Sequence, residues 1–175
     1  LLFLASQEMA FTTILVTFFG GFLFWSPTEY FLHRFVFHYK PSSDFGKRIA
    51  YLIHEVHHDD PNDARRLLMP PSAAMILAVV FYSLFIFVMG AALTKPFFAG
   101  FLAGYLCYDY IHFATHFVKA KGPLLLWLKR NHLAHHFSTP DRRYGVSSGI
   151  LDYIFGTRGN INVRQRNSTE TQTQA

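Results

Sequence analysis

Residues 67–94, LLMPPSAAMILAVVFYSLFIFVMGAALT, are 28 consecutive residues without Asp, Glu, Lys or Arg. A transmembrane helix needs about 20 apolar residues to cross a hydrocarbon core of about 30 Å, whereas apolar runs in buried core helices are commonly about 10–14 residues long. Residues 9–28 are also uncharged, and residues 96–118 carry only the charge of Asp109. The three runs predict membrane spans at about residues 9–28, 72–93 and 96–117.

The composition favours an integral membrane protein. Of the 175 residues, 51% are hydrophobic and 15% are charged, against about 25% charged in ordinary soluble domains. The single cysteine excludes an internal disulfide framework and a cysteine-based zinc site. We interpret the net charge of +5 as a preference for membrane surfaces and expect no nucleic-acid partner. We therefore expect an all-α membrane domain over residues 1–159, followed by a polar, disordered tail over residues 160–175.

The basic residues predict the topology. Fifteen of the 16 Lys and Arg residues lie in residues 34–66 and 119–166, and only Lys95 lies between the second and third runs. By the positive-inside rule, the regions with these 15 residues face the cytoplasm of a bacterial inner membrane or the endoplasmic reticulum. Residues 93–96 then form the tip of a hairpin, with Pro96 in the first turn of a new helix. The first run would enter from the far side, so we expect that an upstream segment is missing.

The ten histidines form four clusters, each near an expected cytoplasmic end of a span. Residues i, i+3 and i+4 share one helix face, so both three-histidine clusters are expected to direct their imidazoles one way. His33 and His38 are five residues apart, which predicts a helix end or a distortion between them. The clusters are His33 and His38; His54, His57 and His58; His112 and His116; and His132, His135 and His136.

Ten imidazoles at one face predict two metal ions with about five ligands each. Imidazole binds Zn, Cu, Fe and Ni, but zinc sites are usually four-coordinate, so two irons with open positions for water or O₂ fit better. A ligating imidazole needs a partner for its second ring nitrogen, often a carboxylate. Glu29, four residues before His33, and Asp109, three before His112, are the candidates. The alternative for Asp109 is a hydrated acid at the membrane interface.

Two other functions remain open on these residues. Residues 54–58, HEVHH, match the HExxH motif of zinc proteases, with Glu55 as the general base, but that reaction leaves eight histidines without a role. A membrane metal store or carrier would need ligands along the crossing path, whereas these gather at one end. Gly20, Gly21, Gly100 and Gly104 either open room for a lipid tail between the spans or allow close helix packing.

The order His-x4-His, His-x2-His-His, His-x3-His, His-x2-His-His resembles the fatty acid hydroxylase/sterol desaturase superfamily of membrane di-iron enzymes. The resemblance covers about residues 22–157. Within it, four stretches look like the fatty acid 2-hydroxylases. They are residues 29–38 (EYFLHRFVFH), 66–71 (RLLMPP), 104–112 (GYLCYDYIH) and 144–157, which begin YGVSS and end DYIFGT.

The resemblance implies transmembrane helices with a cytoplasmic helical cap that carries the dimetal site. It implies an O₂-dependent monooxygenase that hydroxylates carbon 2 of a long-chain fatty acid or a ceramide-type lipid. All ten metal-binding histidines of the superfamily are matched, and zinc can replace iron in purified samples. Eukaryotic members often carry a fused cytochrome b5 domain that this sequence does not show, so we expect a separate cytochrome b5-like or ferredoxin-like electron donor. A carotenoid or sterol-type hydroxylase or desaturase is the alternative, although carotenoid hydroxylases have His-x4-His as their third box.

Overall fold

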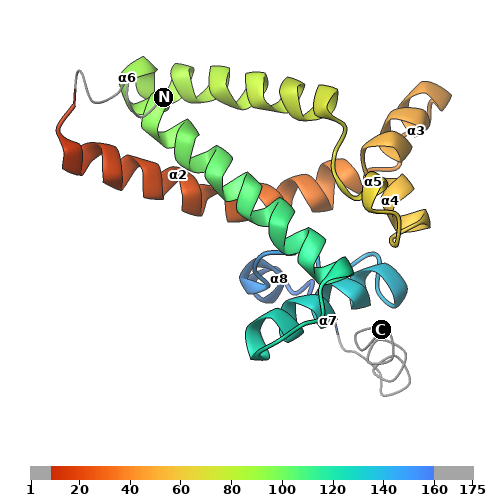
Figure 1. The fold of residues 1–175 in the computed structure, drawn as a ribbon. Coiled ribbons are helices and arrows are strands. Elements are labelled where there is room, and N and C mark those ends of the chain that lie inside the picture. The colour runs from red at the N-terminus through yellow and green to blue at the C-terminus, as the bar shows by residue number, and fades with distance from the viewer. Residues whose placement is uncertain (1–8, 160–175) are drawn as a thin grey trace. The chain divides into compact units, whose positions relative to one another are not determined.

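The computed structural model describes residues 9–159, and these residues form helices and connecting loops without a strand. The expectation of an all-α fold is therefore confirmed for the described part of the chain, while the tail expected at residues 160–175 lies outside it. The elements of Figure 1 are α2 (Phe11–Leu32), the π-helical turn η1 (His33–Phe37), α3 (Asp44–Ala50), the π-helical turn η2 (Tyr51–Glu55), α4 (Val56–Asp59), α5 (Ala64–Leu67), α6 (Pro71–Phe117), α7 (Pro123–Phe137) and α8 (Ile150–Ile154).

The described residues divide into two compact units. Unit 1 consists of residues 9–28 and 69–107, and unit 2 consists of Glu29–Leu68 and residues 108–159. Both α2 and α6 begin in unit 1 and end in unit 2. Unit 1 therefore contains most of the apolar helical sequence, and unit 2 contains all ten histidines.

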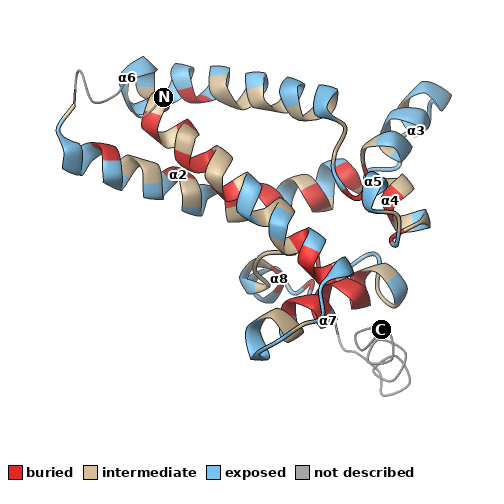
Figure 2. Ribbon diagram, in the orientation of Figure 1, coloured by how far each residue is buried: buried red, intermediate tan, exposed pale blue. Residues whose placement is uncertain are grey.

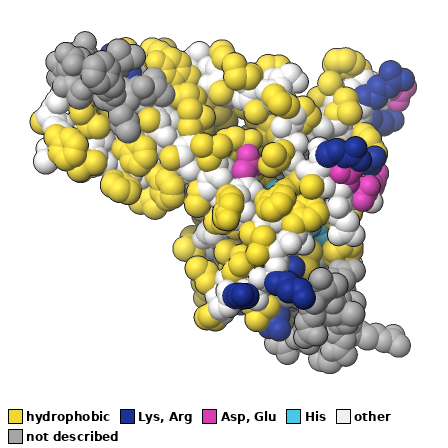
Figure 3. Space-filling view, in the orientation of Figure 1, with side chains coloured by type: hydrophobic (Ala, Val, Ile, Leu, Met, Phe, Trp, Pro, Cys, Tyr) yellow, Lys and Arg dark blue, Asp and Glu magenta, His cyan; other side chains and the backbone are white. Residues whose placement is uncertain are grey.

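The helices of unit 1 expose many large apolar side chains on their outer surface. Two helical stretches, Phe11–Phe37 and Ala64–Phe117, are long and apolar enough to cross a membrane, and only 6% of the most apolar window of the second is buried. Phe87 is 88% exposed, and hydrophobic side chains cover much of the visible surface of the long helices (Figures 2 and 3). An exposed helix that is apolar all round is suited to lipid and not to water.

The expected hairpin is present, but its turn lies earlier than residues 93–96. The chain reverses within α6 at Gly90, where φ is 76° and ψ is 164° (Figure 1). Glycine adopts positive φ without the steric penalty that a Cβ brings. The Thr94 hydroxyl donates to the Gly90 carbonyl at 2.7 Å, and Pro96 lies inside the second helical limb instead of in its first turn. An uncharged run gives no signal for the turn, whereas the glycine does.

Three glycines allow α2 to pack closely against the second limb of α6. A Cβ on Gly21 would lie 1.9 Å from the Phe97 carbonyl oxygen, and one on Gly100 would lie 1.8 Å from that of Phe18. Gly104 is similarly close to Trp25, with 2.6 Å to its Cβ. At these three positions the structure favours helix packing, the commoner role of small residues in membrane helices. At Gly20 the nearest atom to an added Cβ would be 3.9 Å away, so this glycine does not serve close packing.

Phenylalanine rings fill the space between these helices. Phe85 lies between Phe97 and Phe101, with ring centroids 4.9 and 5.2 Å away, and Phe24 of α2 contacts the same cluster. Phe85 and Phe101 are only 4% and 2% exposed. Each such aromatic pair contributes about 0.5–1.5 kcal/mol beyond the area it buries. Unit 1 thus has an aromatic core inside an apolar surface.

Candidate metal centre

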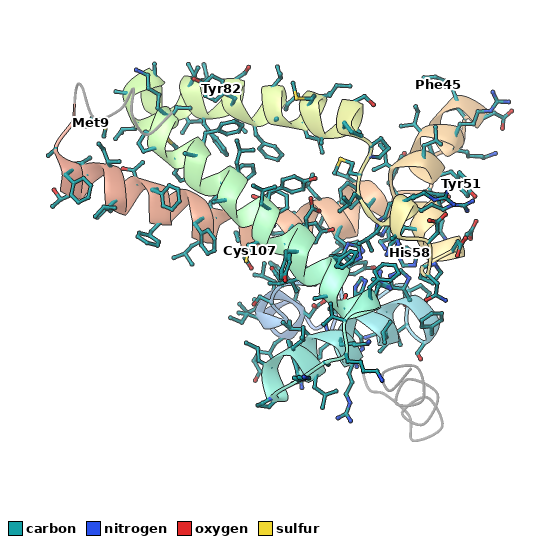
Figure 4. The ribbon with its side chains drawn as sticks, viewed as in Figure 1. Met9, Phe45, Tyr51, His58, Tyr82 and Cys107 are labelled. Carbon is teal, nitrogen blue, oxygen red and sulfur yellow. The ribbon has the colours of Figure 1, made fainter. Side chains whose placement is uncertain are left out.

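The ten histidines of unit 2 meet in two sets of five. Within each set, one ring nitrogen from every histidine lies within 4.8 Å of the corresponding nitrogen of every other. Set A is His33, His38, His54, His58 and His135, and set B is His57, His112, His116, His132 and His136. The two sets touch, because His58 of set A, labelled in Figure 4, stacks on His136 of set B with 4.1 Å between ring centroids.

The π-helical turn η1 brings His33 and His38 into the same set. The His38 N–H donates to the His33 carbonyl at 3.2 Å, which is the i to i+5 hydrogen bond of a π-helix. This wider turn places residues five apart on one face, so the distortion that the spacing predicted is confirmed. A second π-helical turn, η2, contains His54 and leads into α4, which carries His57 and His58.

Each His-x2-His-His motif supplies both sets. His54 and His58 belong to set A and His57 to set B, whereas His132 and His136 belong to set B and His135 to set A. The sequence predicted that all three imidazoles of a motif would point the same way, and this prediction is wrong. Residues i+3 and i+4 are about 100° apart around a helix, enough to direct neighbouring imidazoles toward two separate points.

The spacing of the Nε2 atoms fits metal coordination. Neighbouring Nε2 atoms are 3.0–3.2 Å apart in set A and 2.8–3.1 Å apart in set B. With metal–nitrogen bonds of about 2.1 Å, ligands at right angles have nitrogens about 3.0 Å apart, and tetrahedral ligands about 3.4 Å apart. The observed separations are therefore closer to a five- or six-coordinate arrangement than to a tetrahedral one.

Hydrogen bonding among the imidazoles cannot account for set A. His33 Nδ1 lies 2.6 Å from the Tyr144 carbonyl oxygen, and His135 Nδ1 lies 2.5 Å from that of Arg142. A carbonyl only accepts, so each Nδ1 carries the proton and each Nε2 presents a lone pair. Both lone pairs lie 3.1 Å from His38 Nε2, which has at most one proton to offer. Several lone pairs directed at one point fit a bound cation.

Burial keeps these imidazoles neutral, as metal ligands must be. Burial, with smaller effects from neighbouring imidazoles, lowers the pKa of His57 and of His58 to about 3. Burial also holds the pKa of His132 and of His135 well below the usual range for histidine. A metal does not have to displace protons from neutral imidazoles in order to bind them.

Two buried carboxylates hold the loop that carries the carbonyls of Arg142 and Tyr144. Glu29 accepts from the backbone N–H groups of Val146 and Ser147 at 2.6 and 2.9 Å, and also from the Ser147 hydroxyl. Asp152 accepts from the Tyr144 and Gly145 N–H groups, both at 2.9 Å. Glu29 thus bonds the same loop whose Tyr144 carbonyl contacts His33, and its influence on that imidazole stays a prediction.

The two other acidic residues considered from the sequence, Asp109 and Glu55, are located in the structure without a defined role. Asp109 is half-buried in α6, three residues before His112, and its support of an imidazole stays a prediction. Glu55 is half-buried at the end of η2. Asp152, Arg142 and Tyr144 were not among the site residues predicted from the sequence. Asp152 could have been noticed as the one acid in the YGVSS…DYIFGT stretch, but backbone acceptors leave no signal in a sequence.

Comparison with known proteins assigns the chain to a family. Residues 18–157 match the family model described as fatty acid hydroxylase, which covers all ten histidines. The chain belongs to the fatty acid hydroxylase family. The resemblance to this group that the histidine spacing indicated is therefore confirmed.

Named relatives of this family are similar over most of the chain. A dihydroceramide fatty acyl 2-hydroxylase of Arabidopsis thaliana is 37% identical over 164 residues, which are 94% of this chain and 69% of the relative. Human fatty acid 2-hydroxylase is 40% identical over 141 residues, 79% of this chain and 38% of the relative. A solved structure described as full-length scs7p, with only its hydroxylase domain visible, has a TM-score of 0.85 and 35% identity; it covers 91% of this chain and 61% of that one. The chain thus spans only part of each of these proteins.

Proposed function

We propose that the protein is a membrane monooxygenase that hydroxylates carbon 2 of the acyl chain of a fatty acid or ceramide-type lipid, in sphingolipid metabolism. The observation that carries this proposal is the pair of five-histidine sets in a chain of the fatty acid hydroxylase family. The named relatives, one a dihydroceramide fatty acyl 2-hydroxylase and one a fatty acid 2-hydroxylase, support the position of the hydroxyl and the substrate class.

The ten histidines fit two iron ions, one in each set, and zinc can occupy the same imidazoles in purified samples. Iron would supply the activation of O₂ that replacement of an unactivated C–H hydrogen requires. One oxygen atom enters the lipid and the other leaves as water, so each turnover consumes two electrons and two protons. We infer that a separate cytochrome b5-like or ferredoxin-like protein supplies the electrons.

The residues of this chain would contribute geometry and environment. Buried, neutral imidazoles direct Nε2 lone pairs at two points, and the carbonyls of Arg142 and Tyr144 fix the rings of His135 and His33. The apolar helices of unit 1 would hold the enzyme in the bilayer, where its lipid substrate is found. We also propose that residues 1–159 form one membrane hydroxylase domain, and that unit 2 forms a cap on the cytoplasmic face of the endoplasmic reticulum or the bacterial inner membrane. The bias of Lys and Arg supports that orientation.

The alternatives have less support. A peptidase would use His54 and His58 with Glu55, yet these two histidines are only part of a five-histidine set. A metal store does not explain the membership of the fatty acid hydroxylase family. A carotenoid or sterol-type hydroxylase is the second candidate within the superfamily, and the names of the relatives favour an acyl substrate.

The test is a comparison of lipid extracts from cells that express the protein and cells that do not. We expect 2-hydroxy acyl chains, detected by mass spectrometry of hydrolysed lipids, only in the expressing cells. Cells that express His112→Ala to an equal level are the control, because that variant loses a histidine of set B. Oxidised carotenoids or sterols without 2-hydroxy acyl chains would replace the proposal with the second candidate.

A further inference from the structure

The two histidine sets differ in what holds their rings. In set A, the Nδ1–H groups of His33 and His135 donate to backbone carbonyls at 2.6 and 2.5 Å. In set B, the Nδ1 atoms of His57, His132 and His136 are buried and have no hydrogen-bond acceptor within reach among residues 9–159. Packing, and not such a hydrogen bond, therefore holds these three rings of set B.

The two carbonyls that hold set A flank one strained residue. Arg143 lies between Arg142 and Tyr144, and it is the one non-glycine residue among those described whose φ is positive, at 63°. Its φ sets the plane of the Arg142–Arg143 peptide and therefore the direction of the Arg142 carbonyl. Its buried guanidinium donates to the Asn131 side-chain oxygen at 2.7 Å and to the Gly159 carbonyl at 3.0 Å, which holds that conformation in place.

Residues 142–147, which we call the carbonyl loop, are also held by hydrogen bonds to their backbone. The carboxylates of Asp152 and Glu29, only 1% and 3% exposed, accept four consecutive backbone N–H groups of this loop, from Tyr144 to Ser147. A Cβ on Gly145 would lie 2.0 Å from the Ser148 carbonyl oxygen, so this tight fold of the loop requires glycine here. Rigid acceptors give His33 and His135 a fixed tautomer and a fixed ring orientation.

We propose that the carbonyl loop makes the two metal sites unequal, so that set A binds the first ion tightly and set B binds the second more weakly. A hydrogen bond from the distal ring nitrogen orients a ligating imidazole and raises its basicity, and its loss typically lowers metal affinity about 10–100-fold. Set A has two such bonds to fixed acceptors. This inference rests on the proposed metal centre, and Asp152 and Arg143 act in it as positioning residues.

The test is a metal titration of the full chain in detergent, after its metal has been removed with a chelator. Co²⁺ is the probe, because its absorption bands in the visible range report coordination. Bound Co²⁺ per protein is measured by equilibrium dialysis at buffered free Co²⁺ concentrations. We expect two steps of one ion each, separated at least tenfold in free Co²⁺. Two ions bound in one step would overturn the inference and leave the proposed metal centre intact, whereas no bound ion would overturn both.

Two ligand variants assign the steps to the sets. His38 and His116 are both half-buried and each belongs to one set only. His38→Ala should abolish the tight step and leave the weak one, and His116→Ala should do the reverse. If His116→Ala instead removes the tight step, the order of the two sites is wrong.

The variant Asp152→Asn tests whether the loop is the cause. The carboxylate of Asp152 accepts from three donors, but an amide NH₂ turns one of these contacts into a clash of donors. We expect the tight step to weaken about 10–100-fold and the weak step to stay within about threefold. Asp141→Asn, the same change at an exposed position before the loop, is the control and should leave both steps unchanged. Equal weakening of both steps by Asp152→Asn would show that Asp152 has only a general structural role. The two ligand variants still decide the order of the sites if Asp152→Asn does not fold.

Discussion

Single side chains near the centre have roles that depend on which way the backbone directs them. His57 lies between His54 and His58 along the chain, but it faces set B, while both of its neighbours face set A. Glu55 lies beside His54 but belongs to neither set. Adjacent residues in this motif can therefore have different effects on the reaction, and substitution separates them.

Separate substitutions of Glu55 and of His57 distinguish a hydroxylase from a peptidase. Glu55→Gln should retain most of the hydroxylase activity, because Glu55 is not one of the metal-binding candidates. His57→Gln should abolish activity, because set B loses one of its five imidazoles. The measurement is 2-hydroxy acyl product in cell lipids at matched expression. A peptidase would form no 2-hydroxy acyl product, and its proteolytic activity would be lost in Glu55→Gln, since loss of a general base costs about 10²–10⁴-fold, and kept in His57→Gln.

Asp109 gives a graded prediction. A charge inside an apolar segment is costly and is commonly retained for function. Asp109→Asn should lower metal content or turnover about 10–100-fold while the protein still inserts into the membrane. Metal analysis of the purified variant and the lipid assay check this. Wild-type values for both would mean that Asp109 is only a hydrated acid at the interface.

At the residue scale, spacing alone identified the ten histidines that the structure brings together, because the i, i+3 and i+4 pattern is visible in the sequence. It wrongly predicted that the three imidazoles of each His-x2-His-His motif point the same way, because the direction of each ring depends on the local helix geometry around η2 and α7. The acceptors for His33 and His135 were not predictable, since any residue supplies a backbone carbonyl.

Among the elements, the contact between α2 and the second limb of α6 depends on where glycine occurs. Gly21 and Gly100 each lie against a carbonyl of the opposite helix, whereas the added Cβ of an alanine at Gly20 would meet only a distant ring atom. The sequence suggested both packing and a lipid cavity for these glycines, and only the crossing of the two helices separates the two roles. In the same way, Gly90 and not Pro96 locates the turn of the hairpin.

The contact between α2 and α6 predicts different effects on stability for alanine at Gly100 and alanine at Gly20. Gly100→Ala places a Cβ on the Phe18 carbonyl oxygen and should destabilise the protein by about 1–3 kcal/mol, the usual cost of overpacking. Gly20→Ala should be neutral or slightly stabilising, because alanine favours helix over glycine by about 1 kcal/mol. Thermal denaturation of both purified variants in one detergent provides the comparison. Equal midpoints would contradict the close packing at Gly100.

For the whole molecule, the histidine chemistry lies in one unit, whereas both units expose apolar side chains. The histidines and the buried carboxylates Glu29 and Asp152 belong to unit 2, and most of the apolar helical sequence belongs to unit 1. The alternation of charge-free runs and histidine clusters is visible in the sequence, and from it we predicted a single membrane domain over residues 1–159. The long helices α2 and α6 connect the two units covalently, so neither unit is a separate stretch of sequence.

The proposed topology is testable by cysteine labelling in intact bacterial cells that express the protein in their inner membrane. Cys107→Ala removes the only cysteine, and single cysteines are then placed at two exposed positions, Ala91 beside the hairpin turn and Lys47 in α3. A membrane-impermeant maleimide should label Ala91→Cys in intact cells and Lys47→Cys only after permeabilisation, because the positive-inside rule places Lys47 in the cytoplasm. Labelling of Lys47→Cys in intact cells would reverse the orientation.

The two His-x2-His-His motifs divide their imidazoles between the sets in opposite proportions, and this has a consequence for the loss of metal binding. Each motif gives two imidazoles to one set and one to the other, so displacement of either segment damages both sets together. We therefore expect a displaced motif to weaken both sites at once, whereas loss of a single imidazole weakens only the site to which it belongs.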